Sequence, residues 1–421
     1  METGGFRPLL KNKNFMLLWG EQILSQFAYN LVNFALLIWV FRLTNSSFAE
    51  SLLILSFILP SALFGVFTGV IADLFDRRKI MLTVHIIWAV LALSFIFIRD
   101  NFVLILIFSF ILNTIDRFFT PAEQASLPNI VGKEDLLIAN SFFSFSLNAG
   151  FLLGFSLAGP LMLLFGNDLP FYLASIFITI GLVFIYFLPK LRPFNSQAIL
   201  SLSYIVPETI KQVKHGYQFV RGTKTILLAI GIFSILQIGM NTAMALTPSY
   251  VVNTLGFTDP KHASWVVMFP VGLGSVLAII LLRFWENDLK RFLIERGILI
   301  AGLGLLGLGL TSLIRLSLTN WNFYPLIFIF CLLLGLSVAL ILVPSMTIIS
   351  QQTPNEYLGR VWGVANLIQN TSASIPLLLA GALADRISVL PLIFVVAIIC
   401  IIMYTLSKSA LKSVFFTTNP R

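Results

Sequence analysis

Residues 128–140 read PNIVGKEDLLIAN and residues 354–366 read PNEYLGRVWGVAN, so Pro-Asn is followed at a fixed interval by Ala-Asn in both stretches. Each stretch opens a long apolar segment, and the two lie 226 positions apart in a chain of 421 residues. A repeat at this distance divides the chain into two similar halves. Two similar halves of a very hydrophobic chain are typical of membrane proteins in which one half rocks against the other.

The composition places the chain in a lipid bilayer. Hydrophobic residues make up 58% and charged residues 11%, whereas soluble domains average about 45–50% and about 25%. Apolar segments of about 20 residues, the length that crosses the hydrocarbon core, recur along the chain. Backbone polar groups there must be satisfied within each segment, so every span is predicted to be an α-helix. We predict an all-α membrane protein with twelve transmembrane helices: 15–40, 49–72, 80–98, 102–122, 138–165, 169–189, 226–253, 263–284, 297–315, 323–349, 360–384 and 389–407.

The distribution of positive charge predicts the orientation. With twelve spans and an internal N-terminus, 22 of the 27 lysines and arginines fall on the inner side. The outer five are Arg42, Arg99, Lys261, Arg315 and Arg386. This positive-inside bias predicts an integral protein of the plasma (inner) membrane with both termini in the cytoplasm. It also accounts for the net charge of +9 without a nucleic-acid partner.

One polar interruption separates the two halves. Residues 190–225 carry several basic side chains, while apolar residues recur there at helical spacing, at Val206, Ile210, Val213, Tyr217 and Val220. An apolar stripe opposite a basic face is typical of a helix on the membrane surface. We therefore predict an N-terminal six-helix bundle over 1–190, a cytoplasmic amphipathic linker over 191–225 and a C-terminal six-helix bundle over 226–421, pseudo-symmetric to the first. We expect a monomer in contact with membrane lipids.

Polar side chains within the spans predict a water-accessible interior. They concentrate in spans one, four, five, seven and eleven and are almost absent from six and twelve. Polar groups at membrane depth face a bundle interior or a water-filled cavity, although hydrogen bonding between helices is an alternative use for some of them. The residues predicted to line a cavity are Gln22, Gln26, Asn30, Asn33, Asn113, Asn140, Asn148, Gln237, Asn241, Asn366, Gln369 and Asn370.

The loop after span two carries a family resemblance. Residues 69–79 read GVIADLFDRRK, which resembles the G-x-x-x-D-R-x-G-R-R signature of the major facilitator superfamily. Leu74 replaces a basic residue of that pattern, and Asp76 replaces a glycine. The second departure is similar to the drug:proton antiporter-3 branch, which includes macrolide-efflux and siderophore-export proteins. Further stretches resemble that branch, namely Leu18-Trp19, Asp116-Arg117, Pro121-Ala122, Ala139-Asn140 and Gly359-Arg360-Val361.

The resemblance implies the major facilitator fold and a gating loop. Asp73 would face the positive N-terminal end of span eleven, in a latch that holds the inner gate shut. The basic residues of the loop either pair with acids in that latch or only satisfy the positive-inside rule. The implied gating residues are Gly69, Asp73, Asp76, Arg77, Arg78, Lys79, Gly359 and Arg360. Residues 381–386, which read GALADR, imitate the signature. The helix count places them at the outer end of span eleven, so they are not expected to form the matching inner gate.

Intramembrane acids are the candidates for proton coupling. A secondary transporter needs a group that takes up and releases a proton, and a carboxylate in a low dielectric can do so near neutral pH. The candidates are Glu21 in span one and Asp116 with Arg117 in span four. An isolated charge at the bilayer centre costs about 2.5–3.5 kcal/mol, so retaining one implies pairing or use. The alternatives are a permanent Asp116–Arg117 ion pair and a Glu21 that reaches the interface. His85 can also titrate, but span three is expected to be peripheral.

No other energy source is visible in the sequence. It has no G-x-x-x-x-G-K-[ST] loop to hold nucleotide phosphates, no nucleophile elbow and no metal motif. Cys331 and Cys400 lie inside predicted spans, as core thiols. We predict that the chain is not an enzyme and uses no metal or cofactor, with the proton gradient as its energy source.

These observations predict a proton-coupled secondary transporter. The favoured function is an efflux permease for hydrophobic or amphipathic small molecules, working by alternating access. An importer or a lipid or siderophore carrier on the same fold is the first alternative. A non-transporting membrane scaffold or sensor is the second, although polar stripes in spans one and seven argue against it, since a scaffold needs no wet cavity.

Overall fold

The computed structural model describes residues 6–132, 134–191, 202–282, 290–315, 320–354 and 356–416. The side chains of residues 6, 7, 66, 70, 73, 202–210, 212, 320–322 and 406–416 lie outside that description. Asn355 of the repeat and residues 192–201 of the predicted linker also lie outside the described residues.

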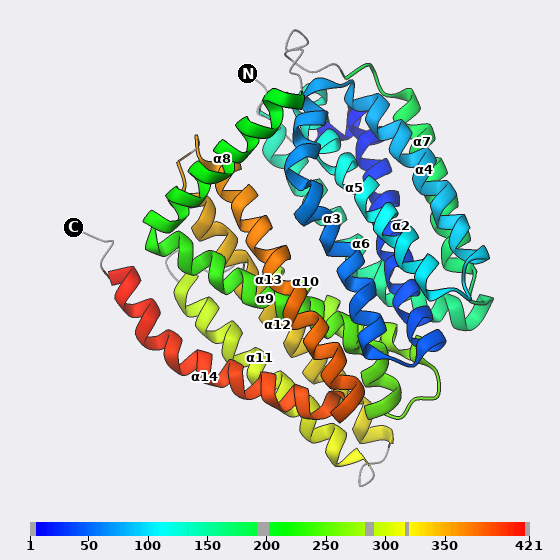
Figure 1. The fold of residues 1–421 in the computed structure, drawn as a ribbon, viewed down its shortest axis with the longest axis vertical. Helices are drawn as coiled ribbons and strands as arrows, with labels where there is room; N and C mark the ends of the chain where they lie inside the picture. The colour runs from blue at the N-terminus through cyan, green and yellow to red at the C-terminus, as the bar shows by residue number, and fades with distance from the viewer. Residues whose placement is uncertain are drawn as a thin grey trace. The chain divides into compact units, whose positions relative to one another are not determined.

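The described chain is built from helices (Figure 1). The first half contains α1 (Phe6–Lys11), α2 (Lys13–Thr44), α3 (Ser47–Leu74), α4 (Arg77–Phe97), α5 (Phe102–Ile130), α6 (Leu136–Phe165) and α7 (Leu169–Phe187). After α8 (Leu202–Gly222), the second half contains α9 (Lys224–Ser249), α10 (Phe269–Leu282), α11 (Lys290–Leu313), α12 (Asn320–Gln352), α13 (Leu358–Ile387) and α14 (Val389–Phe416). Between α9 and α10 lie a π-helix (Tyr250–Thr254), a 3-10 turn (Pro260–His262) and a second π-helix (Ser264–Met268).

Most of these helices suit a bilayer. Among the described residues, eleven helical stretches are long and apolar enough to cross a membrane, and Val389–Thr405 of α14 forms a shorter apolar helix. They occur in the order predicted from hydropathy, so the all-helical membrane class is confirmed. The main difference is α5, which runs past the predicted end at residue 122 and continues through Pro121 and Pro128 to Ile130. Membrane helices tolerate internal proline because neighbouring groups satisfy the freed carbonyls.

The helices form two compact units. Unit 1 comprises Met1–Trp39 and Ser56–Thr209, and unit 2 comprises Val40–Leu55 and Ile210–Arg421. The end of α2 and the beginning of α3 therefore belong with the helices of the second half.

Packing within the two units follows the sequence repeat. In unit 1, α4 packs against α5 and α7. In unit 2 the corresponding helix, α11, packs against α12 and α14, and α13 packs against α9 (Figure 1). The equivalent α6–α2 contact in unit 1 is close because α6 has glycines there. A Cβ at Gly154 would lie 2.6 Å from Cβ of Asn30, and one at Gly150 would lie 2.8 Å from Cβ of Gln26. This approach fixes the face of α2 that turns toward α4 and α5.

Candidate functional site

A buried acid–base pair lies in the core of unit 1. Oε1 of Glu21 on α2 lies 3.0 Å from Nε2 of His85 on α4, and the two side chains are 0% and 3% exposed. His85 Nδ1 lies 3.1 Å from the carbonyl oxygen of Met81, one turn earlier in α4. Gly181 on α7 makes room for the pair, since a Cβ there would lie 3.3 Å from His85 Nε2 and 3.4 Å from Glu21 Cγ.

This geometry requires a proton between the two side chains. A carbonyl only accepts, so Nδ1 of His85 carries the hydrogen that it donates to Met81. A neutral ring then presents Nε2 as an acceptor, and an ionised Glu21 carboxylate is also only an acceptor. Two acceptors 3.0 Å apart would repel each other. The contact therefore depends on one shared proton, carried either by the carboxyl group or by the imidazole ring.

A second buried acid stands beside this pair. Glu123 on α5 is 3% exposed, and it interacts electrostatically with Glu21 and Asp116. Its Oε1 has no hydrogen-bond partner among the described residues. An ionised carboxylate away from water needs a partner, and three neighbouring carboxylates repel when all are ionised. The group of Glu21, His85, Glu123 and Asp116, whose members interact electrostatically, is called the acid cluster below.

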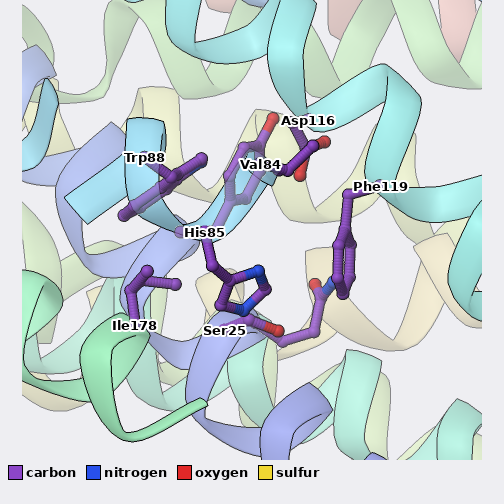
Figure 2. A pocket seen from close by; sticks show the side chains of 9 residues that line it. Ser25, Val84, His85, Trp88, Asp116, Phe119 and Ile178 are labelled. Atoms are coloured by element: carbon purple, nitrogen blue, oxygen red, sulfur yellow. The ribbon is translucent and has the colours of Figure 1, made fainter. Parts of the chain in front are cut away.

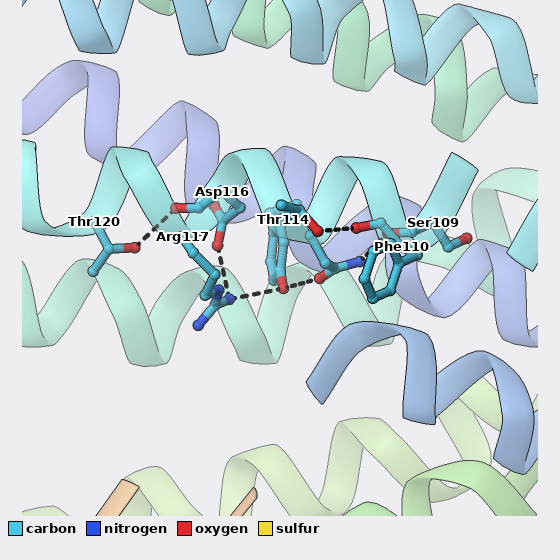
Figure 3. A network of polar contacts seen from close by, with 8 residues as sticks. Ser109, Phe110, Thr114, Asp116, Arg117 and Thr120 are labelled. Carbon is cyan, nitrogen blue, oxygen red and sulfur yellow. Dashed lines mark hydrogen bonds and ion pairs between the residues drawn. The ribbon is translucent and has the colours of Figure 1, made fainter. Parts of the chain in front are cut away.

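Asp116 belongs to a hydrogen-bonded network on α5 (Figure 3). Nη2 of Arg117 donates to Oδ2 of Asp116 at 2.8 Å and lies 3.4 Å from the hydroxyl oxygen of Tyr29. The Tyr29 hydroxyl in turn donates to Oδ1 of Asn113 at 2.6 Å. The Asp116–Arg117 ion pair, considered from the sequence as an alternative role for Asp116, is therefore present in this structure.

A small cavity lies against two members of the acid cluster (Figure 2). His85 and Asp116 both line it. The remaining lining side chains are Ser25, Gln26, Tyr29, Val84, Trp88, Phe119 and Ile178. Its wall thus combines aromatic and aliphatic side chains with polar and ionisable ones.

The predicted cavity-lining amides of unit 1 fall into two groups. Gln22, Asn30, Asn33 and Asn113 are buried and Gln26 is half-buried, all on α2 or α5. By contrast, α6 exposes Asn140 and Asn148, each of which donates to a carbonyl one turn earlier in its own helix, at 2.8 and 2.7 Å. The structure therefore buries most of the first group and leaves the two α6 amides exposed.

In unit 2 the predicted amides lie on two helices that pack together, α9 and α13. Asn241 and Gln369 are buried, and their amide nitrogens have no hydrogen-bond partner among the described residues. Gln237 is half-buried, Asn366 is exposed, and Asn370 donates to the Asn366 carbonyl at 2.9 Å.

The predicted gating loop makes its described contacts within unit 1. Asp76 caps α4 by accepting from the backbone N–H of Arg78 at 3.0 Å. Arg77 donates to the carbonyl oxygens of Ala72 and Ala125, at 3.3 and 2.6 Å. Arg78 donates to those of Ile185 and Tyr186 at the end of α7. Both arginines thus donate to carbonyl groups near the C-terminal ends of helices, where a positive charge is favourable.

The other predicted gating residues make few contacts within the described part of the chain. Lys79 is exposed, and a Cβ at Gly69 or at Gly359 would meet nothing within 4 Å. The guanidinium of Arg360 lies over the Tyr357 ring, 5.5 Å from its centroid. The side chain of Asp73 lies outside the described residues.

The sequence does not identify Glu123 or one further acid, Glu50, and it gives little weight to His85. Span three is expected to be peripheral, yet the His85 ring turns toward α2. Glu123 escapes notice because the predicted span four ends at residue 122. Its spacing of seven residues from Asp116 places both on one helix face and is the signal that would have found it. Glu50 in the first turn of α3 is also fully buried.

The chain is similar in sequence to known membrane proteins. The family model described as the Major Facilitator Superfamily matches residues 18–375. The chain is similar to macrolide efflux protein A of Streptococcus pyogenes, with 26% identity over 94% of this chain and 98% of that protein. It is similar to the uncharacterized MFS-type transporter YfiS of Bacillus subtilis, with 26% identity over 91% of this chain and 90% of that protein. These relatives confirm the predicted resemblance and the prediction that the chain is not an enzyme.

Solved structures share the fold. The nucleoside transporter NupG has a TM-score of 0.72 and 11% identity, with 95% of this chain and 99% of that chain covered. A POT family transporter in complex with 5-aminolevulinic acid has a TM-score of 0.73 and 14% identity, with 96% of each chain covered. At such identities the likeness concerns the fold alone.

Proposed function

Because the chain belongs to the major facilitator superfamily, we propose that it is a proton-coupled exporter of hydrophobic or amphipathic small molecules that works by alternating access. Family membership and the membrane-spanning helices make it an integral membrane transporter of small molecules. Proton coupling is the additional step. The observation that carries it is the buried Glu21–His85 contact, which depends on a shared proton.

Loss of that proton changes the contact between two helices. An ionised Glu21 facing an acceptor nitrogen at 3.0 Å repels it, so α2 and α4 separate at this point. Regaining the proton draws them together again. Differential contacts in two states are what a driving ligand must supply to shift a conformational equilibrium. The Glu123 carboxyl stands beside the pair and can accept or return the proton.

The proton gradient is large enough for this work, without a nucleotide or other cofactor. A potential of 100 mV supplies about 2.3 kcal/mol for each charge moved. Holding a tenfold concentration ratio of a neutral cargo requires about 1.4 kcal/mol. One proton per cycle can therefore sustain more than about a tenfold ratio.

The direction of transport and the chemical class of the cargo are supported by separate observations. Export is supported by the relatives named as macrolide efflux proteins. A hydrophobic or amphipathic cargo is supported by the 40 phenylalanines of the chain. The excess of lysine and arginine on the predicted inner side supports a plasma-membrane location with both termini in the cytoplasm.

Reconstituted vesicles test the proposal. A growth screen against toxic compounds, including a macrolide, first selects the cargo. Purified protein in liposomes is then given an inward or outward pH gradient, and cargo accumulation is followed together with a trapped pH-sensitive dye. We expect wild-type protein to accumulate cargo against its gradient while protons move the opposite way. If Glu21→Gln and Asp116→Asn both leave proton-driven accumulation intact, the coupling assignment is wrong.

A further inference from the structure

We propose that Asp385, at the end of α13, closes the predicted outer end of the transporter by capping the first turn of α3, and that this contact opens once in every transport cycle. The residues involved, Ser46, Ser47, Ser51, Gly381 and Asp385, are called the rim latch below. The proposal rests on alternating access as proposed above, and it is independent of how protons are coupled.

The latch is a helix cap supplied by another helix. Oδ1 of Asp385 accepts from the backbone N–H of Ser47 at 2.6 Å. Oδ2 accepts from the Ser46 hydroxyl at 2.6 Å and from the backbone N–H of Phe48 at 3.2 Å. The first N–H groups of a helix have no partner inside it, and a negative charge is favourable at this end. A residue 338 positions away in the chain therefore completes α3.

Gly381, one turn before Asp385, lets the two helices meet. A Cβ at Gly381 would lie 2.3 Å from Oγ of Ser51 and 2.7 Å from the carbonyl oxygen of Ser47. Below this approach, the Ser47 hydroxyl donates to that of Ser249 at 2.8 Å. Ser47, Ser51 and Ser249 are buried, whereas Asp385 is exposed. The three buried serines, called the dry layer below, thus lie beneath the exposed Asp385 carboxylate.

These features favour a contact that separates and reforms. Its members are a glycine, serines and one exposed acid, and the hydrogen bonds of each can be replaced by water once the helices part. The G-x-x-x-D spacing of the latch also occurs at the end of α3, as Gly69 and Asp73. Each of these two helices therefore carries the pattern at its C-terminal end, and the α13 copy meets the beginning of α3. This assigns a function to the GALADR sequence, which the helix count excludes from the inner gate.

Thiol labelling measures how often the latch opens. In a background of Cys331→Ala and Cys400→Ala, Ser51→Cys places a reporter in the dry layer, and a membrane-impermeant thiol reagent is added outside intact cells. We expect Asp385→Ala to raise the labelling rate about fivefold, because labelling follows the open population. Asp385→Asn, which keeps two acceptor lone pairs, should raise it less. Asp100→Asn, an exposed acid elsewhere, is the matched control and should change nothing. Equal labelling in Asp385→Ala and the parent overturns the proposal.

A cross-link distinguishes a moving latch from a permanent seal. The Ser47 and Ser249 hydroxyl oxygens are 2.8 Å apart. A cysteine sulfur takes the place of a serine oxygen, so thiols at these two positions can form a disulfide that leaves Asp385 intact. We expect oxidised Ser47→Cys/Ser249→Cys protein to lose transport, and a reductant to restore it. Transport by the fully cross-linked protein would show a static contact and overturn the proposal. Folding is checked by size-exclusion chromatography. The labelling result does not depend on coupling, so its failure is separable from failure of the proposed proton mechanism.

Discussion

Glu21 in the core of unit 1 and Asp385 at the rim of unit 2 each join two helices, but they do so with opposite requirements for a proton. Glu21 meets an acceptor nitrogen and keeps its contact only while a proton is shared. Asp385 accepts from Ser46, Ser47 and Phe48, and these three hydrogen bonds need no proton on its carboxylate. Under the proposed proton coupling, the gradient acts on the first contact directly, whereas the second contact depends only on the positions of the two helices.

Burial explains this difference. Glu21 is 0% exposed, so its charge has no water to stabilise it and the contact must include a proton or a cation. Asp385 is exposed, and water competes for each of its hydrogen bonds, which lowers the net contribution of each bond to stability. The core site is thus suited to energy input and the rim latch to reversible closure.

The largest effect is expected from Glu21→Gln. The amide keeps the size of the side chain but cannot release a proton, so accumulation driven by a pH gradient should fall by about tenfold or more, to the level of passive equilibration. Exchange of cargo without a gradient should continue. Asp385→Asn should slow the cycle while preserving the accumulation ratio. Both are measured as cargo uptake into proteoliposomes. A Glu21→Gln protein that still accumulates cargo would remove the distinction between the two sites.

The next effect is on stability, and it comes from His85→Leu. This change leaves a buried carboxylate without its partner, which costs about 3 kcal/mol or more. Adding Glu21→Gln to His85→Leu should recover a large part of the loss, because the unpaired acid is then gone. Thermal unfolding in detergent measures both variants. If the double variant is no more stable than His85→Leu alone, the ring contributes by packing and not by holding a proton.

A smaller loss is expected from Gly381→Ala. The new methyl group would overlap the Ser51 hydroxyl and the backbone carbonyl of Ser47, and the backbone cannot move aside as a side chain can. Overpacking of this kind costs about 1–3 kcal/mol. The helix ends should separate, which raises labelling by an impermeant thiol reagent. Because Ser51 itself contacts the new methyl group, the reporter for this variant is Ser249→Cys and not Ser51→Cys. Unchanged labelling and unchanged melting would show that α13 and α3 are not held together at the rim.

The sequence predicts the fold well and the site only in part. Hydropathy and length determine which segments span the bilayer, so the helices appear where the apolar segments are. Glu21 and Asp116 are recognisable because an acid at membrane depth is rare. Their partners are not, because pairing depends on how each helix is rotated. The glycines of α6 and Gly181 of α7 set that rotation through close approach, and a single sequence does not report such contacts.

The rim latch illustrates the same limit. The spacing of Gly381 and Asp385 is visible in the sequence, and the helix count correctly separates it from the signature loop. Nothing local indicates that its partner is the beginning of α3, because the two stretches lie more than 330 positions apart. Long-range pairing of helix ends is a property of packing, and it emerges only when the whole chain is placed.

The smallest effect, and the finest test of the comparison, is Gly181→Ala. A Cβ there would lie 3.3–3.4 Å from the His85 ring and Glu21 Cγ, so both side chains need to shift by only a few tenths of an ångström. We expect a loss of stability of about 1 kcal/mol or less, below that of Gly381→Ala. Gly231→Ala, where a Cβ meets nothing within 4 Å, is the control and should be neutral or slightly stabilising. Because the shift occurs at the proton-sharing contact, Gly181→Ala should change the pH profile of transport, whereas Gly381→Ala should change only its rate. An unaltered profile in Gly181→Ala would place the proton-dependent step elsewhere in the acid cluster.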